Sequence, residues 1–325
     1  MRTAILDLGT NTFNLLIIET ETEDRKNIIL SRKEPVKLGD SGITKGVISN
    51  KAFERGITAI ESHMKYIKDY RVEQIHAFAT SAIRTAGNGL EFVRTVYQKF
   101  NIGIQVISGD QEAGLVYQGV KQAVDMGNRK HLILDIGGGS NELIIANGKK
   151  IFWKKSYPLG VARLLEQFKP ADPVGKDDIL ALENHFRKSM SCFFEAAGEH
   201  HPEILIGSSG SFDTFRALLT AIKTKPRAND IPLQGAPGDR ATLAPSYRIR
   251  PSDFLRLHRK LLVSDARERL SMEGMEPMRV EMIVIASIFV NFIVRELNIG
   301  QLIQSEYALK EGAVAGIINM HVQSA

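Results

Sequence analysis

The sequence predicts an α/β protein made of two tandem domains of the same fold. Three observations support this prediction: the length of the chain, a repeated segment, and an order of strands and helices that begins again halfway. A chain of 325 residues is long for one domain, since domains average roughly 150 residues. Hydrophobic residues make up 43% of the chain, which is enough for two cores.

The repeated segment reads "LDLGTNTFNLLI" at residues 6–17 and "LDIGGGSNELII" at residues 134–145. Aligned without gaps, and with the residue before each copy included, identical pairs are Ile5 and Ile133, Leu6 and Leu134, Asp7 and Asp135, Gly9 and Gly137, Leu15 and Leu143, and Ile17 and Ile145. Chance similarity between two apolar strands would explain the aliphatic pairs, but it would not place an aspartate and a glycine in register. The repeat therefore favours duplication.

The first half is predicted to have the order βββαβαβα. The strand that ends at Asp7 is followed by a strand at 13–20 and, after a charged turn, by a strand from about Asn27. Apolar residues then recur at helical spacing, at Phe53, Ile57, Ile60, Met64 and Ile67. The half ends with a strand at 75–80, a helix from about Gly89, a strand at 102–107 and a helix from about Gln111.

The second half begins the same order again. Strands are predicted at 131–136, 142–146 and 150–157, and Asn147-Gly148 is a favoured turn pair between the last two. The next elements are one helix with apolar residues at Ile179, Leu182, Phe186, Met190 and Phe193, a strand at 203–206 and a helix at 212–222. The proline, glycine and charge content of Lys225 to Pro245 predicts a long loop.

Composition indicates where the protein works. The single cysteine, Cys192, excludes an intramolecular disulfide, and we find neither a signal sequence nor an apolar run of the roughly 18 residues that a membrane span needs. The net charge of +5 and the pI of about 9.1 favour anionic partners only weakly, and no nucleic-acid-binding motif is present. We therefore expect a cytoplasmic protein with no nucleic acid or membrane partner.

Tandem βββαβαβ units that each open with an aspartate and a glycine-containing hairpin resemble the actin, sugar kinase and Hsp70 ATPase superfamily. The resemblance implies two ribonuclease H-like domains, also called actin-like ATPase domains, that face each other across a cleft. Their two hairpins would hold a phosphate chain from opposite sides. Glycines suit this role because they let the backbone turn tightly and bring N–H groups close to an anion. The candidate phosphate-binding residues are Gly9, Thr10, Asn11, Thr12, Gly137, Gly138, Gly139 and Ser140. The alternative is a tight turn capped by its aspartate.

Asp7 and Asp135 end the two equivalent strands, where a carboxylate alone would repel a phosphate. Both residues are compatible with a phosphate site if a divalent cation lies between carboxylate and phosphate. Mg²⁺ is the expected cation, because it binds one or two carboxylates together with water and substrate phosphates.

A third glycine segment, "GSSGS" at 207–211, lies between a strand and a helix N-terminus. Unpaired N–H groups at such a position favour an anion. This adds Gly207, Ser208, Ser209 and Gly210 as candidate phosphate-binding residues. The alternative is a simple helix N-cap at Ser209 or Ser211.

Glu112 lies in the first predicted turn of the helix that leads from the first half into the second. A carboxylate there would face the cleft and could take a proton from a water that attacks a terminal phosphorus. A glutamate in a first turn more commonly stabilises the helix dipole, so its position leaves both roles open.

Five segments, in order, resemble the motifs of the exopolyphosphatase and guanosine pentaphosphate phosphohydrolase family: "AILDLGTNTFNLLI", "FATSAIRTAGNG", "ISGDQEAGLVYQGV", "ILDIGGGSNELII" and "IGSSGSF". The resemblance implies removal of a terminal phosphate from a phosphoanhydride chain by water, with Mg²⁺. It implies Glu112 as the catalytic glutamate, Glu142 as a glutamate needed for metal or water, and Asp135 as the metal-linked aspartate. It also implies that Arg84 contacts phosphate. Without the resemblance, the alternative role of Arg84 is an exposed charge on a surface helix. The predicted metal-binding residues are Asp7, Asp135 and Glu142.

The chain departs from the family pattern at several positions. Gln111 and Gly114 stand where the family has a glutamate and an arginine, and Glu281, Ala308 and Lys310 differ from its C-terminal motifs. The chain also resembles the short, two-domain form of the family, in which a second subunit of a homodimer could supply the grip on a long substrate.

The resemblance further implies that the last helix returns to the first domain. The predicted domains are therefore residues 1–123 with 304–325, and residues 124–303. We expect an Mg²⁺-dependent exopolyphosphatase that releases orthophosphate from inorganic polyphosphate. Guanosine pentaphosphate, a phosphorylated guanine nucleotide, is the alternative substrate. A catalytically weak nucleotide- or polyphosphate-binding sensor is the alternative from another class, and a sugar kinase is less favoured because no motif supplies a base for a sugar hydroxyl.

Overall fold

Each half of the chain forms its own sheet in the structure, a computed structural model that describes residues 1–22, 25–222 and 245–322. The first sheet has the order β3-β2-β1-β4-β5, with β1 antiparallel to β2 and parallel to β4. Its strands are β1 (Arg2–Leu8), β2 (Thr12–Thr22), β3 (Arg25–Pro35), β4 (Gln74–Ala79) and β5 (Ile104–Val106).

The second sheet repeats this topology and adds one edge strand. Its order is β10-β11-β9-β6-β7-β8, with β6 antiparallel to β7 and parallel to β9. Its strands are β6 (His131–Ile136), β7 (Asn141–Ala146), β8 (Ile151–Tyr157), β9 (Ile204–Ser208), β10 (Ser246–Ile249) and β11 (Gln301–Ser305). Because the β1-β2-β3-β4 and β6-β7-β8-β9 strands take the same places, the prediction of two related α/β units is confirmed.

Helices cover both sheets and close each core. The first half has α1 (Asn50–Asp69), α2 (Ser81–Thr85), α3 (Gly89–Phe100) and α4 (Gly109–Ala123). The second half has α5 (Val161–Phe168), α6 (Lys176–Ser189), α7 (Ser191–His200), α8 (Ser209–Ile222), α9 (Pro251–Val263), α10 (Ala266–Leu270), the 3₁₀ helix η1 (Pro277–Arg279), α11 (Met282–Glu296) and α12 (Leu309–Val322). No helix in these described parts is long and apolar enough to cross a membrane.

The prediction of one helix spanning Ile179 to Phe193 is wrong. The chain leaves helical geometry at Met190, with φ −114° and ψ 27°, and this break separates α6 from α7. Phe186 and Phe193 therefore lie on different helices, and both are fully buried in the second core. The turn predicted at Asn147-Gly148 spans residues 147–150, and nearly all of the predicted loop from Lys225 lies outside the described residues.

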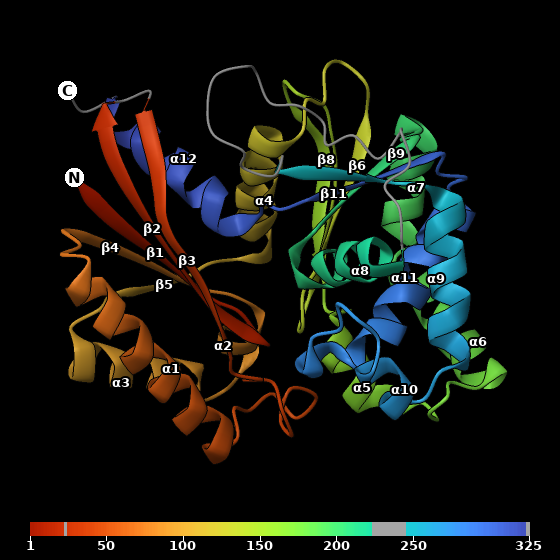
Figure 1. Cartoon of the computed structure of the whole chain (residues 1–325), viewed down its shortest axis with the longest axis horizontal. Coiled ribbons are helices and arrows are strands. Elements are labelled where there is room, and N and C mark those ends of the chain that lie inside the picture. The colour runs from red at the N-terminus through yellow and green to blue at the C-terminus, as the bar shows by residue number, and fades with distance from the viewer. Residues whose placement is uncertain (23–24, 223–244, 323–325) are drawn as a thin grey trace.

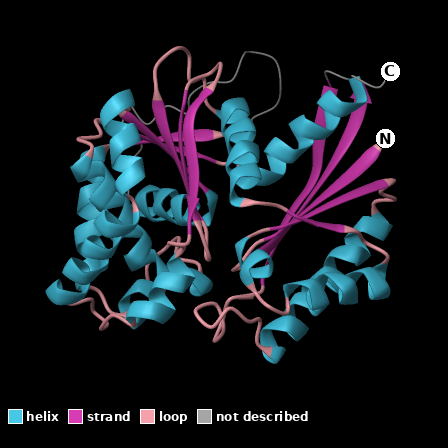
Figure 2. Cartoon of the chain, turned by 180° about the vertical axis from the view of Figure 1, so that it is seen from behind, coloured by secondary structure: helices cyan, strands magenta, loops and turns pink. Residues whose placement is uncertain are grey.

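The last helix connects the end of the chain to its beginning. In Figures 1 and 2, α4 and α12 lie between the two sheets, and α12 runs beside β1 and β2. Ala313 and Val314 of α12 share a buried cluster with Ile5 and Leu16 of the first sheet. The two helices approach closely through glycines, since a Cβ on Gly312 would lie 1.8 Å from the carbonyl oxygen of Leu115 in α4.

This contact predicts a large difference between two glycines of one helix. Gly312→Ala is expected to lower the free energy of unfolding by about 1–3 kcal/mol, because the methyl group forces α12 away from the backbone of α4. Gly316→Ala is the matched control: a Cβ there meets open space, so the better helix propensity of alanine should raise stability by about 0.5–1 kcal/mol. Urea unfolding measures both, and equal effects would contradict the close packing.

Candidate active site

A cavity of about 1230 Å³ lies between the two sheets and brings most of the predicted site residues together. The predicted residues that line it are Asp7, Gly9, Thr10, Asn11, Thr12, Glu112, Asp135, Gly137, Gly138, Gly139, Ser140, Glu142, Ser209 and Gly210. Arg84, Gly207 and Ser208 are not part of the lining. The cavity is therefore formed by the β1–β2 and β6–β7 hairpins and by the first turns of α4 and α8.

The two predicted phosphate loops are built in the same way. The N–H of Gly9 donates to the carbonyl of Thr12 at 3.1 Å, and the N–H of Gly137 donates to the carbonyl of Ser140 at 3.0 Å. A Cβ on either glycine would lie within 3 Å of that carbonyl oxygen, so these turns require glycine. The Thr12 hydroxyl is buried and has no hydrogen-bond partner, which leaves it available to a ligand.

The loops also touch each other. A Cβ on Gly138 would lie 2.6 Å from the Asn11 side chain, and one on Gly139 would lie 2.7 Å from the Thr10 hydroxyl. The absence of side chains at Gly138 and Gly139 therefore lets the two halves of the molecule meet at the cavity.

The hairpins place their carboxylates at matching positions. Asp7 pairs with Asn14 across the β1–β2 ladder, and Asn14 Nδ2 donates to Asp7 Oδ2 at 2.9 Å. Asp135 pairs with Glu142 across the β6–β7 ladder, and Ser156 Oγ donates to Glu142 Oε1 at 2.7 Å. The duplicated hairpin thus presents one carboxylate from the first half and two from the second.

These carboxylates and Glu112 have raised pKa values. Burial is the main cause in each case: it raises the pKa of Asp7 to about 6, of Asp135 to about 6 and of Glu112 to about 7. Burial and the neighbouring charges of Glu112 and Asp135 raise the pKa of Glu142 well above its usual value. Such a cluster of buried, mutually repelling acids is typical of a site that binds a cation or moves a proton.

Glu112 lies in the first turn of α4, where Ser108 and Gln111 form a capping box. Its Oε2 accepts a hydrogen bond from Arg84 Nη1 at 2.8 Å, and the same nitrogen donates to the carbonyl of Ile107 at 2.9 Å. Arg84 therefore neutralises and orients Glu112 in the structure, and its predicted contact with phosphate stays a prediction.

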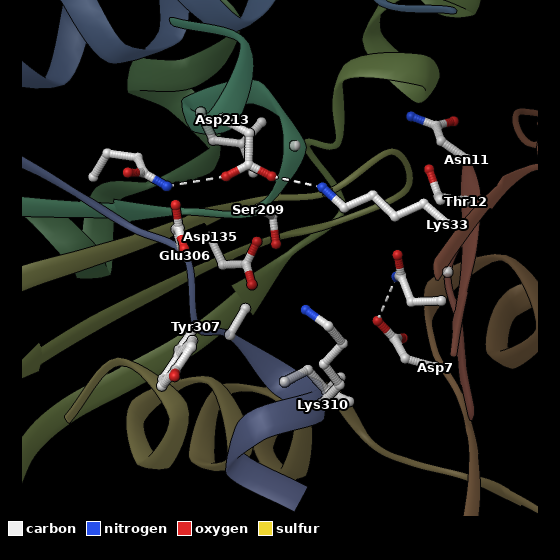
Figure 3. A pocket seen from close by; sticks show the side chains of 18 of the residues that line it. Asp7, Asn11, Thr12, Lys33, Asp135, Ser209, Asp213, Glu306, Tyr307 and Lys310 are labelled. Atoms are coloured by element: carbon white, nitrogen blue, oxygen red, sulfur yellow. Dashed lines mark hydrogen bonds and ion pairs between the residues drawn. The ribbon is translucent and has the colours of Figure 1, made fainter. Parts of the chain in front are cut away.

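In the third glycine segment, the first two residues pack in the core and the next two line the cavity. A Cβ on Gly207 would lie 2.1 Å from the Phe212 ring, so this glycine makes room for the core, and Ser208 is fully buried. The helix begins at Ser209, three residues before the predicted start at Phe212. Ser209 adopts a φ of 67°, which is uncommon for a residue with a side chain. Its side chain lies beside Asp135 (Figure 3), and a hydrogen bond from its hydroxyl lowers the pKa of that carboxyl. Only Ser209 and Gly210 reach the cavity.

Eight charged residues that line the cavity were not among the predicted site residues: Lys33, Asp213, Arg216, Glu273, Arg279, Glu306, Lys310 and Glu311. The Arg279 guanidinium packs directly on Gly210, where a Cβ would lie 1.9 Å from Nη2. Lys310 is buried and pairs with Glu311 at 2.7 Å (Nζ to Oε1). Lys310 is one of the departures from the C-terminal family motifs, and Arg279 lies two residues before another departure, Glu281, so these motifs were the available signal for both.

The departure at Gly114 has a structural counterpart. A Cβ there would lie 3.6 Å from Lys154 Nζ, which comes from β8 of the second half and pairs with Asp110 Oδ2 at 3.0 Å. A cation thus lies beside the position where the family carries its arginine. Gln111 completes the capping box and carries no charge.

The donor set fits the predicted Mg²⁺ ion. Within residues 1–22, 25–222 and 245–322, no three His, Cys, Asp or Glu side chains are arranged to hold a metal ion by themselves. Mg²⁺ does not require this, because it commonly binds one or two carboxylates and completes its shell with water and substrate phosphates. Asp7 and Asp135 line one cavity, and the charge of Asp7 raises the pKa of Asp135. Together with Glu142 they would hold the ion, which would supply positive charge for the phosphates.

Comparison with known proteins adds independent support. The model of the Ppx/GppA phosphatase family matches residues 17–321. The chain is similar to an exopolyphosphatase from Cytophaga hutchinsonii, with 33% sequence identity, a TM-score of 0.90 and 98% of each chain covered. It is also similar to the Aquifex aeolicus member of the Ppx/GppA family, with 22% identity, a TM-score of 0.75, and coverage of 100% of this chain and 98% of that one. The latter similarity concerns the fold alone.

Proposed function

The chain belongs to the Ppx/GppA phosphatase family, a family of phosphoanhydride hydrolases, and from this premise we propose that it is an Mg²⁺-dependent exopolyphosphatase. The proposed reaction is hydrolytic release of terminal orthophosphate from inorganic polyphosphate. The observation that carries the proposal is Glu112, a buried carboxylate with a pKa of about 7 in a cavity bounded by two glycine loops. The cytoplasmic location and the homodimer remain predictions.

Glu112 supplies the general base in this proposal. A carboxylate with a pKa near the working pH is partly ionised, and it is basic enough to take a proton from an attacking water. The hydrogen bond from Arg84 fixes the orientation of Oε2 and keeps part of the population ionised. The proton of the water moves to Glu112 while the water oxygen forms the new bond to the terminal phosphorus. The bond between that phosphorus and the bridging oxygen breaks, and the shortened polyphosphate leaves with the bridging oxygen and its electron pair.

The two glycine loops bind and orient the phosphate that is released. Their N–H groups and the Thr12 hydroxyl can donate hydrogen bonds to the negative charge that develops on the phosphoryl oxygens. The acids Asp7, Asp135 and Glu142 oppose a bare polyanion, which is why the proposal includes Mg²⁺.

Phosphate release by the purified protein tests the proposal. With Mg²⁺, the protein should release orthophosphate from polyphosphate faster than from guanosine pentaphosphate, and EDTA should abolish release until Mg²⁺ is added in excess. Faster release from guanosine pentaphosphate would replace the substrate but keep the reaction class. Release that survives chelation would contradict the role of Mg²⁺, and tight binding of polyphosphate without any release would favour a sensor.

A further inference from the structure

An ion pair between two lining residues, Lys33 and Asp213, crosses the cavity from the first half of the chain to the second. Lys33 on β3 extends toward α8, and its Nζ lies 2.8 Å from Asp213 Oδ2 (Figure 3). The other oxygen of the same carboxylate accepts a hydrogen bond from Gln304 Nε2 at 3.0 Å. Asp213 is therefore held from two sides, whereas within the described part of the chain the Lys33 ammonium pairs with Asp213 alone.

The cavity wall is strongly acidic for a protein that takes a polyanion. Its acidic lining residues are Asp7, Glu112, Asp135, Glu142, Asp213, Glu273, Glu306 and Glu311, and its basic ones are Lys33, Arg216, Arg279 and Lys310. Acids outnumber bases two to one, so each cation that can turn toward a phosphate has a large effect on binding.

Two of the four cations are paired and largely buried, and a third is itself buried. Lys310 pairs with Glu311 and is only 12% exposed, and Arg216 pairs with Glu306 and is 18% exposed. The Arg279 side chain is 9% exposed and lies against the backbone at Gly210. The Lys33 side chain is 47% exposed, and it is the only cation that the described part of the first half contributes to the wall.

An exposed lysine–carboxylate pair is weak, because solvent screens the attraction and holding the long lysine side chain in one conformation costs entropy. A phosphate group carries more charge than a carboxylate and offers more acceptor oxygens, so it competes well for the same ammonium. If Lys33 leaves, Asp213 keeps the hydrogen bond from Gln304 and is not left without a partner.

We infer that Lys33 is a substrate-binding residue that exchanges Asp213 for a phosphate of the polyphosphate chain when substrate enters the cavity. This inference rests on the proposed function. Asp213 then competes with the substrate for Lys33 and holds the ammonium until substrate binds. Lys33 would contact a phosphate other than the one released, so it favours substrates with at least one further phosphate.

The two members of the pair provide an unusually sharp test, because exchange predicts effects of opposite sign. Lys33→Ala should raise KM for tripolyphosphate about tenfold while lowering kcat much less, since one charge-assisted hydrogen bond to substrate is lost. Asp213→Asn should lower KM by about threefold, because the competing charge is removed. The double variant should have the KM of Lys33→Ala, because Asp213 acts through Lys33. Lys65→Ala, which removes an exposed lysine on α1 outside the cavity, is the control.

A purely structural clamp between the two halves would give a different pattern. Both single variants would then break the same bridge and change KM in the same direction, and that result would overturn the inference, as would unchanged KM in Lys33→Ala. Failure of the proposed function is a separate outcome, seen as no phosphate release by the wild-type protein. In that case the affinity of the same variants for tripolyphosphate is measured by calorimetry. Exchange predicts weaker binding in Lys33→Ala and tighter binding in Asp213→Asn, whereas a structural clamp predicts changes in the same direction.

Discussion

Glu112→Gln is expected to lower kcat for phosphate release by at least about a hundredfold, with a much smaller change in KM. The amide has the same shape as the carboxylate but cannot accept a proton from water. The hydrogen bond from Arg84 Nη1 can still reach the amide oxygen, so the position of the side chain should persist. The loss therefore reports the missing base rather than a displaced loop.

Glu91→Gln is the matched control for this variant. Glu91 also lies in the first turn of a helix, α3, but it is exposed and is not part of the cavity wall. Both variants remove one negative charge from a helix N-terminus, where such a charge stabilises the helix modestly. Phosphate release measured over a range of substrate concentrations should separate them, and near-normal kcat in Glu112→Gln would exclude Glu112 as the base.

The acids of the two hairpins could be predicted from sequence, because the repeat aligns the first hairpin with the second residue by residue. Once Asp7 and Asp135 are aligned, the alternation of side chains in a strand places Asn14 opposite the first and Glu142 opposite the second. The same logic predicted the two loops, since a turn that closes from Gly9 to Thr12 must close again from Gly137 to Ser140. Local rules therefore suffice for this part of the cavity.

The roles of other residues depend on neighbours from distant parts of the chain, so local sequence rules do not predict them. Gly207 has the surroundings of a phosphate loop in sequence, yet the Phe212 ring occupies the space beside it. Lys33 and Asp213 are 180 residues apart and meet only because β3 and α8 border the same cavity. Arg84 was predicted to bind phosphate, and its ion pair with Glu112 was not foreseen from the sequence. A motif indicates which residue type is needed but not which partner it meets.

The ion pair between Arg84 and Glu112 predicts a large change in the pH dependence of activity when Arg84 is replaced. Arg84→Met is expected to move the acidic limb of the pH profile of kcat/KM to higher pH by about 1–3 units, which is the usual effect of an opposite charge on a neighbouring carboxylate. Arg84 lowers the pKa of Glu112, whose raised value of about 7 is caused mainly by burial. Without the guanidinium the pKa of Glu112 rises further, so less of it is ionised at neutral pH.

The sign of this shift distinguishes two roles for Arg84. The ionised carboxylate is the active base, so a higher pKa should lower activity at pH 7 by about tenfold or more and should restore much of it as the pH approaches 9. Arg84→Lys keeps the positive charge and should shift the limb less, although it loses the planar geometry of the guanidinium. If Arg84 acted only on substrate phosphate, Arg84→Met would raise KM by a similar factor at every pH and leave the limb in place. The contact of 2.8 Å between Nη1 and Oε2, with side chains only 20% and 11% exposed, favours the shift, because poor screening makes the charge of Arg84 strongly felt at Glu112.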